Sequence, residues 1–167
     1  MRDQYDLSEE QPGDRWEVEN LLDLCFAPGR TALSSYRLRD GVAPVAALCL
    51  VARDTYGIIA GAIRYWPVKV GSHAVLLLGP VAVHPTRQGE GLGALLIQDS
   101  LERAARAGWN RVLLVGDAPY YGRFGFDRLD GVEMPPPTNP ARVLGYEVHD
   151  GAWHGVKGAV TRWADNG

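Results

Sequence analysis

Apolar residues at helical spacing predict two main helices. From Trp16 to Phe26 they recur every three or four positions, after the turn and N-cap signal Pro12-Gly13-Asp14. The longest helix is predicted from Gly89 to Ala107, and Gly108 is suited to the C′ position after it. The apolar stripe of this helix consists of Ala94, Ile97, Leu101, Ala104 and Gly108. Shorter helices are predicted over Thr31–Leu38 and Ala118–Phe124.

Apolar runs in the middle of the chain predict the main strands. Val45–Val51 is nearly continuous, as in a strand buried on both faces, and is expected to form a hairpin with Ile58–Val70. Within that second strand, Gly61 favours a bulge or a close contact. His73–Val83 is a third strand, which Gly79-Pro80 should kink or part from a neighbour because proline lacks a backbone donor. Further strands are predicted at Gln4–Ser8, Arg111–Val115, Val143–Val148 and Gly155–Val160, with a proline-rich loop at Glu133–Pro140.

The order of these elements predicts the fold class. A strand, helices, hairpin strands and a strand–helix–strand unit indicate an α+β (mixed α/β) fold, with a central mixed, mostly antiparallel sheet flanked by helices. The last unit needs a right-handed parallel crossover if its two strands share the sheet. Because no linker divides the sequence, residues 1–167 are expected to form a single domain.

Composition and charge mainly exclude classes of partner, location and cofactor. The chain is 46% hydrophobic with a formal net charge of −3, and without a basic stretch no nucleic-acid partner is expected. No apolar run is long enough to span a membrane, and the polar N-terminus is unlike a secretory signal. Cys25 and Cys49 lie in apolar runs, so a reducing, cytoplasmic location is expected. The four histidines form no H-x-x-x-H pair, and no metal is expected.

The candidate chemistry lies in the motif Gln88-Gly89-Glu90-Gly91-Leu92-Gly93. It stands between a predicted strand and the N-terminus of the longest helix. The unpaired N–H groups and partial positive charge of a helix N-terminus favour a phosphate, and glycines let a bulky anion approach. Arg87 adds a formal positive charge beside the loop. The sequence therefore predicts a phosphate- or pyrophosphate-binding loop.

A dinucleotide-binding oxidoreductase is one alternative. Gly89, Gly91 and Ala94 match the G-x-G-x-x-G/A fingerprint. In that fingerprint the strand runs almost directly into the first glycine, whereas His84–Gln88 intervenes here. The preceding hairpin and the short remaining chain also disagree with two nucleotide-binding halves, so this alternative is less favoured.

Two sequence phrases in a fixed order are more specific than the loop alone. Leu78–Pro85 is followed by Arg87–Gly93, and Tyr121–Phe126 comes after the next helix and strand. Together they resemble the GNAT superfamily of N-acetyltransferases. Its acetyl-CoA motif is Gln/Arg-x-x-Gly-x-Gly/Ala after a strand ending in apolar-x-Val-x-Pro, and its second phrase is Tyr-x-x-x-Gly-Phe. The detailed resemblance covers about Leu76 to Phe126.

The resemblance implies acetyl-CoA as co-substrate. In the family, the strand before the loop is splayed from its neighbour and pairs with pantetheine, while loop amides hold the pyrophosphate. The Val83 amide is the nearest match to the oxyanion donor. Carried onto this chain, the cofactor-binding residues are Val81, Ala82, Val83, Gln88, Gly89, Glu90, Gly91, Leu92, Gly93, Ala94 and Tyr121.

The implied reaction is direct attack of a primary amine on the thioester in a ternary complex. Tyr121 matches the family's catalytic tyrosine, which protonates the departing thiolate. Asp117 lies where members often carry asparagine, and helix capping is its simplest role. The general base is not identified, because His73–Val83 contains no carboxylate.

The resemblance does not specify the acceptor. A small-molecule or peptide amine is implied, and Tyr36 is expected on the acceptor side. A homodimer is a further expectation that no residue decides. The missing strand carboxylate also leaves room for an alternative function, a non-catalytic acyl-CoA-binding or sensor domain.

Overall fold

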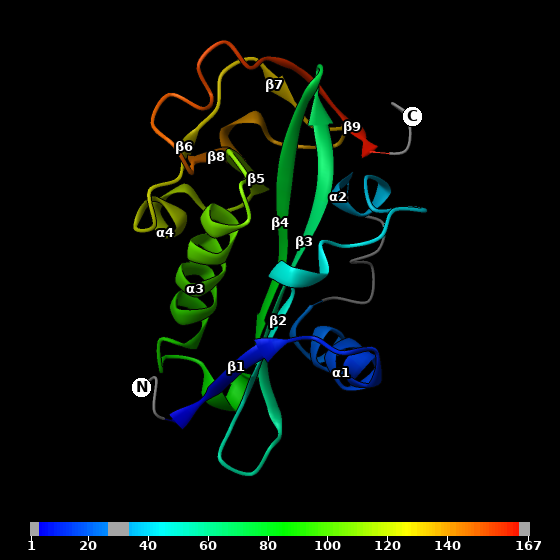
Figure 1. Cartoon of the computed structure of the whole chain (residues 1–167), viewed down its shortest axis with the longest axis vertical. Coiled ribbons are helices and arrows are strands. Elements are labelled where there is room, and N and C mark those ends of the chain that lie inside the picture. Colours follow the sequence, from blue (N-terminus) through cyan, green and yellow to red (C-terminus); the bar gives the residue numbers. More distant parts are fainter. Residues whose placement is uncertain (1–3, 27–33, 164–167) are drawn as a thin grey trace.

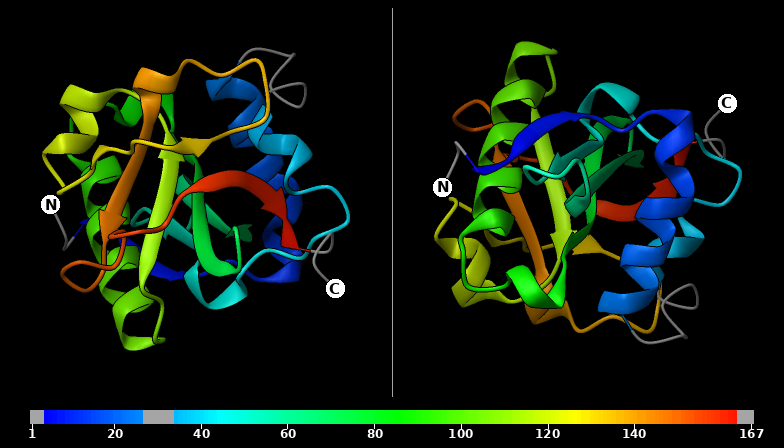
Figure 2. Two further views of the ribbon diagram at one scale, coloured as in Figure 1. Left: turned by 90° about the horizontal axis from the view of Figure 1, so that it is seen from above. Right: turned by 90° about the horizontal axis from the view of Figure 1, so that it is seen from below.

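The central sheet is covered by helices on both faces. The computed structural model describes residues 4–26 and 34–163. Helix α1 (Arg15–Cys25) packs on one face and α3 (Leu92–Arg106) on the other, as two perpendicular views show (Figures 1 and 2). The mixed, mostly antiparallel sheet flanked by helices confirms the predicted fold class.

The sheet follows the strand order β1-β2-β3-β4-β5-β8-β6, and β9 pairs with the second half of β3. Along this path β4 and β5 are parallel, and the other neighbours are antiparallel. The described strands are β1 (Asp6–Glu9), β2 (Leu50–Arg53), β3 (Ile59–Val70), β4 (His73–Val83), β5 (Arg111–Val115), β6 (Asp127–Arg128), β7 (Val132–Glu133), β8 (Val143–Glu147) and β9 (Gly158–Arg162). The short helices are α2 (Ser34–Arg37) and α4 (Ala118–Gly122).

β4 and β5 separate part-way along β4, and this separation positions the site. Their pairing is confined to Leu76 and Leu77 of β4, while β4 continues beside β3 to Val83. The register between β3 and β4 shifts near Gly79-Pro80. Trp66 Nε1 donates to the Gly79 carbonyl at 2.9 Å and holds this irregular backbone. The predicted kink is therefore a bulge, accompanied by the predicted parting from a neighbour.

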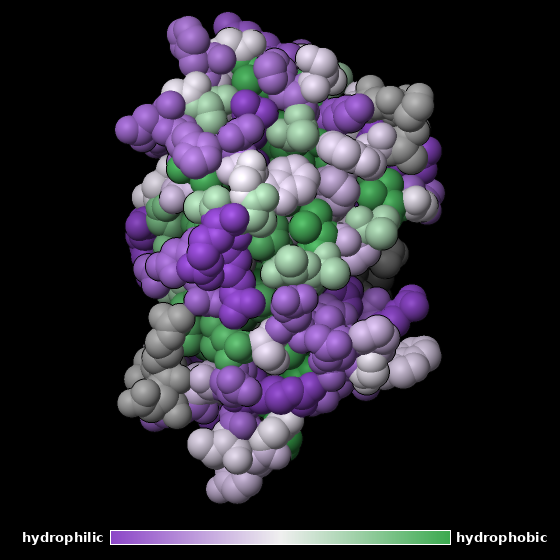
Figure 3. Space-filling view, in the orientation of Figure 1, coloured by the Kyte–Doolittle hydropathy of each residue, from purple (hydrophilic) through white to green (hydrophobic). Residues whose placement is uncertain are grey.

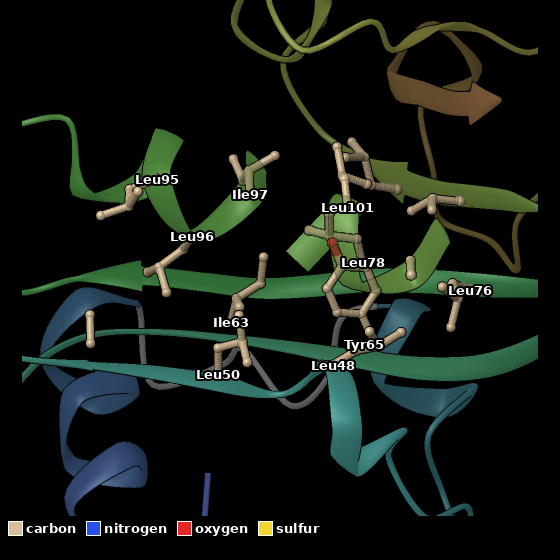
Figure 4. Packing of buried hydrophobic residues seen from close by; sticks show 14 of the residues in the cluster. Leu48, Leu50, Ile63, Tyr65, Leu76, Leu78, Leu95, Leu96, Ile97 and Leu101 are labelled. Atoms are coloured by element: carbon tan, nitrogen blue, oxygen red, sulfur yellow. The ribbon is translucent and has the colours of Figure 1, made fainter. Parts of the chain in front are cut away.

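The core between α3 and the sheet fixes the helix that follows the glycine-rich loop. Leu96 of α3 is fully buried near Ile63 of β3 (Figure 4). The Tyr65 and Ser100 hydroxyls share a 2.7 Å hydrogen bond, so neither is left unsatisfied in the core. A Cβ on Gly61 would lie 3.0 Å from Leu96 Cδ1, which confirms the close contact predicted at this glycine.

The opposite face carries α1. Side chains alternate along a strand. In β2, Leu50 and Ala52 therefore pack in the cluster that includes α3, whereas Val51 packs with Val18 and Leu21 of α1. The prediction of a first helix over residues 16–26 is confirmed within one residue at each end.

Several predicted boundaries are wrong. The apolar run Val45–Val51 is a 3₁₀ turn at Ala46–Leu48 followed by β2, because Cys49 N–H bonds to the Ala46 carbonyl instead of a neighbouring strand. The last strand begins at Gly158, not Gly155, after a series of turns. The predicted helix over residues 31–38 is α2, shorter than expected, and residues 31–33 lie outside the described residues.

Candidate active site

The loop between β4 and α3 presents backbone N–H groups to an open cavity. Gly91 is the N-cap of α3, with φ +81° and no side-chain capping bond. The first helical bond runs from Leu95 N–H to the Gly91 carbonyl at 3.1 Å, so Leu92, Gly93 and Ala94 have N–H groups without a helical partner. A cavity of about 580 Å³ lies beside them. This geometry is suited to an anion.

The other glycines of the loop serve two purposes. Gly89 has φ +86°, and a Cβ there would meet nothing within 4 Å, so its backbone conformation requires glycine. A Cβ on Gly93 would lie 3.2 Å from the Tyr120 hydroxyl and 3.7 Å from Val83 Cγ2. Gly93 therefore provides the space in which α3, α4 and the end of β4 meet.

A polar cluster holds the loop from outside. Arg87 Nη2 lies 2.8 Å from Asp54 Oδ2, and its Nη1 donates to the Tyr5 hydroxyl at 3.3 Å. The Tyr5 hydroxyl in turn donates to Glu90 Oε1 at 2.6 Å. The Glu90 carboxylate is therefore bound by Tyr5, which directly precedes β1. Only the backbone of Glu90 is then available to a cofactor.

Two arginines line the cavity beside the loop. Arg87 was predicted at this position, whereas Arg123 was not singled out. The Arg123 guanidinium lies 5.1 Å from the centroid of the Tyr120 ring and 5.3 Å from that of Phe124. It occupies a variable position within the second sequence phrase, so only the fold reveals its place. Both charges complement a phosphate-bearing ligand.

The end of β4 forms the wall of this cavity. His84 N–H donates to the Ala60 carbonyl of the β3 side at 2.8 Å. Backbone groups alternate between the two edges of a strand, so Val81 and Val83 turn their N–H groups towards the gap left by β5, while the Val83 carbonyl accepts a hydrogen bond from Cys25 Sγ at 3.2 Å. Both valines line the cavity. The Ala82 side chain instead packs with α1, on the opposite face.

Tyr121 stands on α4 across the gap from β4. Asp117 caps this helix, since its Oδ2 accepts from Tyr120 N–H at 3.0 Å, which confirms capping as its role. A Cβ on Gly116 would lie 2.6 Å from Tyr121 Cε2, so the absence of a side chain at Gly116 makes room for the ring. Burial raises the pKa of Tyr121 to about 12, and the hydroxyl is protonated at neutral pH.

A second, smaller cavity of about 180 Å³ lies on the other side of Tyr121. It is bordered by the β4 bulge and by the region after α1, and it shares Val81 and Tyr121 with the larger cavity. Hydrophobic residues gather over the centre of the face seen in Figure 3, bordered by hydrophilic ones. The residues that line the second cavity are Phe26, Tyr36, Arg39, Leu77, Leu78, Gly79, Pro80, Val81, Leu114, Val115 and Tyr121. Tyr36, which the sequence predicts on the acceptor side, thus lines this second cavity.

Acidic groups are absent from the described lining of both cavities. It includes neither a carboxylate nor a histidine. Among residues 4–26 and 34–163, no three metal-binding side chains are grouped to hold an ion. Within the same ranges, no helix is long and apolar enough to cross a bilayer. The charged groups in the described lining of the two cavities are therefore the arginines Arg87, Arg123 and Arg39, beside backbone amides and tyrosine hydroxyls.

Comparisons with known proteins agree with this geometry. The model of the acetyltransferase (GNAT) domain family matches residues 46–128. YhbS of Escherichia coli strain K12, an uncharacterised N-acetyltransferase, is 31% identical over 160 residues, covering 90% of this chain and 92% of the relative.

Solved structures extend the comparison to the cofactor. The crystal structure of the GNAT family N-acetyltransferase YhbS from Escherichia coli in complex with CoA has a TM-score of 0.83 and 27% identity, covering 95% of this chain and 89% of that one. A GNAT family acetyltransferase from Brucella melitensis in complex with acetyl-CoA has a TM-score of 0.64 and 29% identity, covering 89% and 97%.

The similarity extends across nearly the whole chain and both sequence phrases. It favours acetyl transfer over a dinucleotide-dependent oxidoreductase and over a non-catalytic acyl-CoA sensor. The chain therefore belongs to the GNAT family, as an acetyl-CoA-dependent N-acetyltransferase.

Proposed function

We propose that this protein moves the acetyl group of acetyl-CoA to a primary amine of a small-molecule or peptide acceptor, by direct attack in a ternary complex. The observation that carries the proposal is the meeting of the two cavities at Val81 and Tyr121. A thioester that enters along the larger cavity and an amine that enters through the smaller one reach each other at this junction. Proximity of the two reactants then replaces a bimolecular encounter.

The larger cavity is proposed to hold the CoA arm. Its pyrophosphate binds the amides from Gln88 to Ala94, including that of Glu90, whose carboxylate is bound by Tyr5, and that of Leu92, whose side chain is buried in the core. Arg87 and Arg123 supply positive charge. Pantetheine pairs with the backbone of Val81–Val83, as a strand added to the free edge of β4.

The chemistry follows from the groups at the junction. The amine nitrogen bonds to the thioester carbon, the C–S bond breaks, and the thiolate takes the proton of the Tyr121 hydroxyl, which regains a proton from water before the next turnover. The negative oxygen of the intermediate needs a backbone donor. The sequence favoured the Val83 amide, but Val81 borders both cavities, so we assign the Val81 amide this role.

The amine must lose a proton before or during attack. Because the described lining of both cavities holds no carboxylate or histidine, we propose that water passes this proton to solvent. The reaction should then speed up with pH as more of the acceptor amine is neutral.

Three broader assignments remain proposals. Residues 1–167 are proposed to form one domain, since β1 and β9, near opposite ends of the chain, both join the same sheet. A cytoplasmic location is proposed because Cys25 and Cys49 are free thiols. A homodimer stays a prediction from the sequence.

The test is an acetyl-transfer screen. Purified protein is mixed with acetyl-CoA and amino acids, polyamines, aminoglycosides or peptides with a free N-terminus, and both thiol release and acceptor mass are measured. We expect amine-dependent thiol release with a matching acetylated product. Tight acetyl-CoA binding with only amine-independent hydrolysis across the panel would contradict the proposal and favour the acyl-CoA-binding alternative.

A further inference from the structure

The smaller cavity contains a buried cation. Arg39 is 9% exposed and borders this cavity beside the β4 bulge. Its guanidinium carbon lies 3.9 Å from the centroid of the Tyr36 ring and 5.2 Å from that of the Trp66 ring. A Cβ on Gly79 would lie 3.6 Å from Arg39 Nη2. The two rings therefore hold the charge next to the junction at which transfer is proposed.

Arg39 has no ion pair in the described part of the chain; Tyr36, through a hydrogen bond, and the more distant charge of Glu19 only partly offset the effect of burial on its pKa. The Arg39 Nε has no hydrogen-bond partner among the described residues. The neighbouring Arg64 instead binds Glu10 through two hydrogen bonds of 3.0 and 2.9 Å, with Glu19 at 3.8 Å. Glu10 and Glu19 line a further cavity that Arg39 also borders, and both form their ion pairs with Arg64.

Such an arrangement costs free energy in the empty protein. Burial is the main cause that lowers the pKa of Arg39, and a buried cation is unfavourable unless it is paired. Contact with an aromatic ring offsets only part of this cost. A buried guanidinium that forms no ion pair with a carboxylate of the protein would therefore be stabilised by an anionic group of the ligand.

We propose that Arg39 binds a carboxylate of the acceptor, so that the substrate class is small molecules carrying both a primary amine and a carboxylate. This inference rests on the proposed amine acetylation. A planar guanidinium binds a planar carboxylate through two parallel hydrogen bonds, which fixes orientation as well as position. With the acid group on Arg39, the amine is directed to Val81 and Tyr121.

The size of the cavity limits the acceptor. About 180 Å³ is below the 300–1,000 Å³ typical of pockets for drug-sized ligands. Leu77, Pro80 and Leu114 give it an apolar wall. The acceptor should therefore be of amino-acid size, with few or no further polar groups between the amine and the acid.

The experiment compares acids with amides that share the same amine. Rates of acetyl transfer are measured for α-amino acids, for the ω-amino acids β-alanine and γ-aminobutyrate, and for the matching carboxamides. In parallel, calorimetry measures binding of the N-acetylated acids and amides to the CoA-loaded protein. The α and ω series distinguish a carboxylate on the carbon that carries the amine from a carboxylate further along the chain.

Wild type is expected to prefer acids over amides by a factor on the order of 10–100 in kcat/KM and in Kd, as for a hydrogen-bonded pair with a charged group. Arg39→Met should remove this preference, and Arg39→Lys should keep only part of it. The control is Arg37→Met, since exposed Arg37 bonds the Pro136 carbonyl at 2.6 Å and should leave the preference intact. Melting temperature and CoA affinity report whether each variant folds.

Each outcome decides a separate point. Amides used as well as acids by wild type would overturn the role of Arg39 and leave amine acetylation standing. Acids that bind through Arg39 without any acetyl transfer would support the carboxylate site and contradict the proposed function. Failure of every acid to bind the CoA-loaded protein would overturn the inference, whether or not other amines are acetylated.

Discussion

Tyr121 is the single residue on which the proposed chemistry depends most. Its hydroxyl is protonated at neutral pH, as an ordinary tyrosine with a pKa of about 10 would be, and burial raises its pKa further, to about 12, so it is available as a proton donor. Tyr121→Phe should lower kcat by about 10²–10⁴-fold, the usual contribution of a positioned acid, with CoA affinity nearly unchanged. Steady-state kinetics and calorimetry measure the two effects. The matched control is Tyr146→Phe, whose ring contacts Phe126 outside both cavities.

Gly116 provides a test of how the Tyr121 ring is positioned. A methyl group there would lie 2.6 Å from the ring, which is held between Tyr120 and Phe126, so the ring must move. Gly116→Ala should cost about 1–3 kcal/mol of stability and lower kcat more than it raises the KM for acetyl-CoA. Gly122→Ala is the control, since its Cβ would meet nothing within 4 Å. Equal kinetics of the two variants would argue against a positioned Tyr121.

At the scale of the elements, α3 offers a comparison between its own two ends. Gly91 precedes the helix and Gly108 follows it, with φ +81° and +88°, and neither has an atom within 4 Å of an added Cβ. Alanine at either position should cost about 1–2 kcal/mol from the left-handed backbone. Only Gly91→Ala also places a methyl group at the loop. It should weaken CoA binding by at least about tenfold, whereas Gly108→Ala should leave the Kd unchanged; equal Kd values would contradict a phosphate site at this end.

Elements with local signals could be predicted from the sequence, and those set by distant contacts could not. The α1 periodicity, the β4 run and the Gly108 stop signal each depend on nearby residues. The turn at Ala46–Leu48 depends on where β2 meets its partners, so an apolar run alone was misleading.

The site residues also fall into those with local sequence signals and those set by distant contacts. Glycine spacing and Tyr121 were visible as short phrases, whereas Arg39 and Arg123 gain their places only when α2, β4 and α4 come together. The turn position of Arg39 carries no local signal, because its burial comes from Tyr36 and Trp66. Gly116 likewise has no local signal, because its role depends on the Tyr121 ring that packs against it.

At the scale of the whole molecule, stability should depend on alkaline pH. The pKa of Tyr121 is about 12 when folded and about 10 when unfolded. A raised pKa gives stability that is complete below pH 10 and is lost as the pH rises towards 12. At pH 11.5 the loss from this group is about 2 kcal/mol. Tyr65, whose pKa burial also raises, acts in the same direction.

Urea unfolding at pH 9 and pH 11.5 measures this loss. Wild type should lose about 2 kcal/mol more than Tyr121→Phe between the two pH values, since phenylalanine cannot ionise. Identical losses in the two proteins would mean that Tyr121 is as accessible to water in the folded chain as in the unfolded one.

Hydrogen–deuterium exchange with and without CoA tests the central claim most directly, because that claim assigns the cofactor to particular backbone amides. In the free protein the N–H groups of Leu92, Gly93 and Ala94 have no helical partner and should exchange quickly. CoA should slow exchange in peptides covering Val81–Val83 and Gln88–Ala94, and leave the β8 peptide at Val143–Glu147 unchanged. Saturating CoA that leaves exchange at the loop and at the end of β4 unaltered would contradict the account.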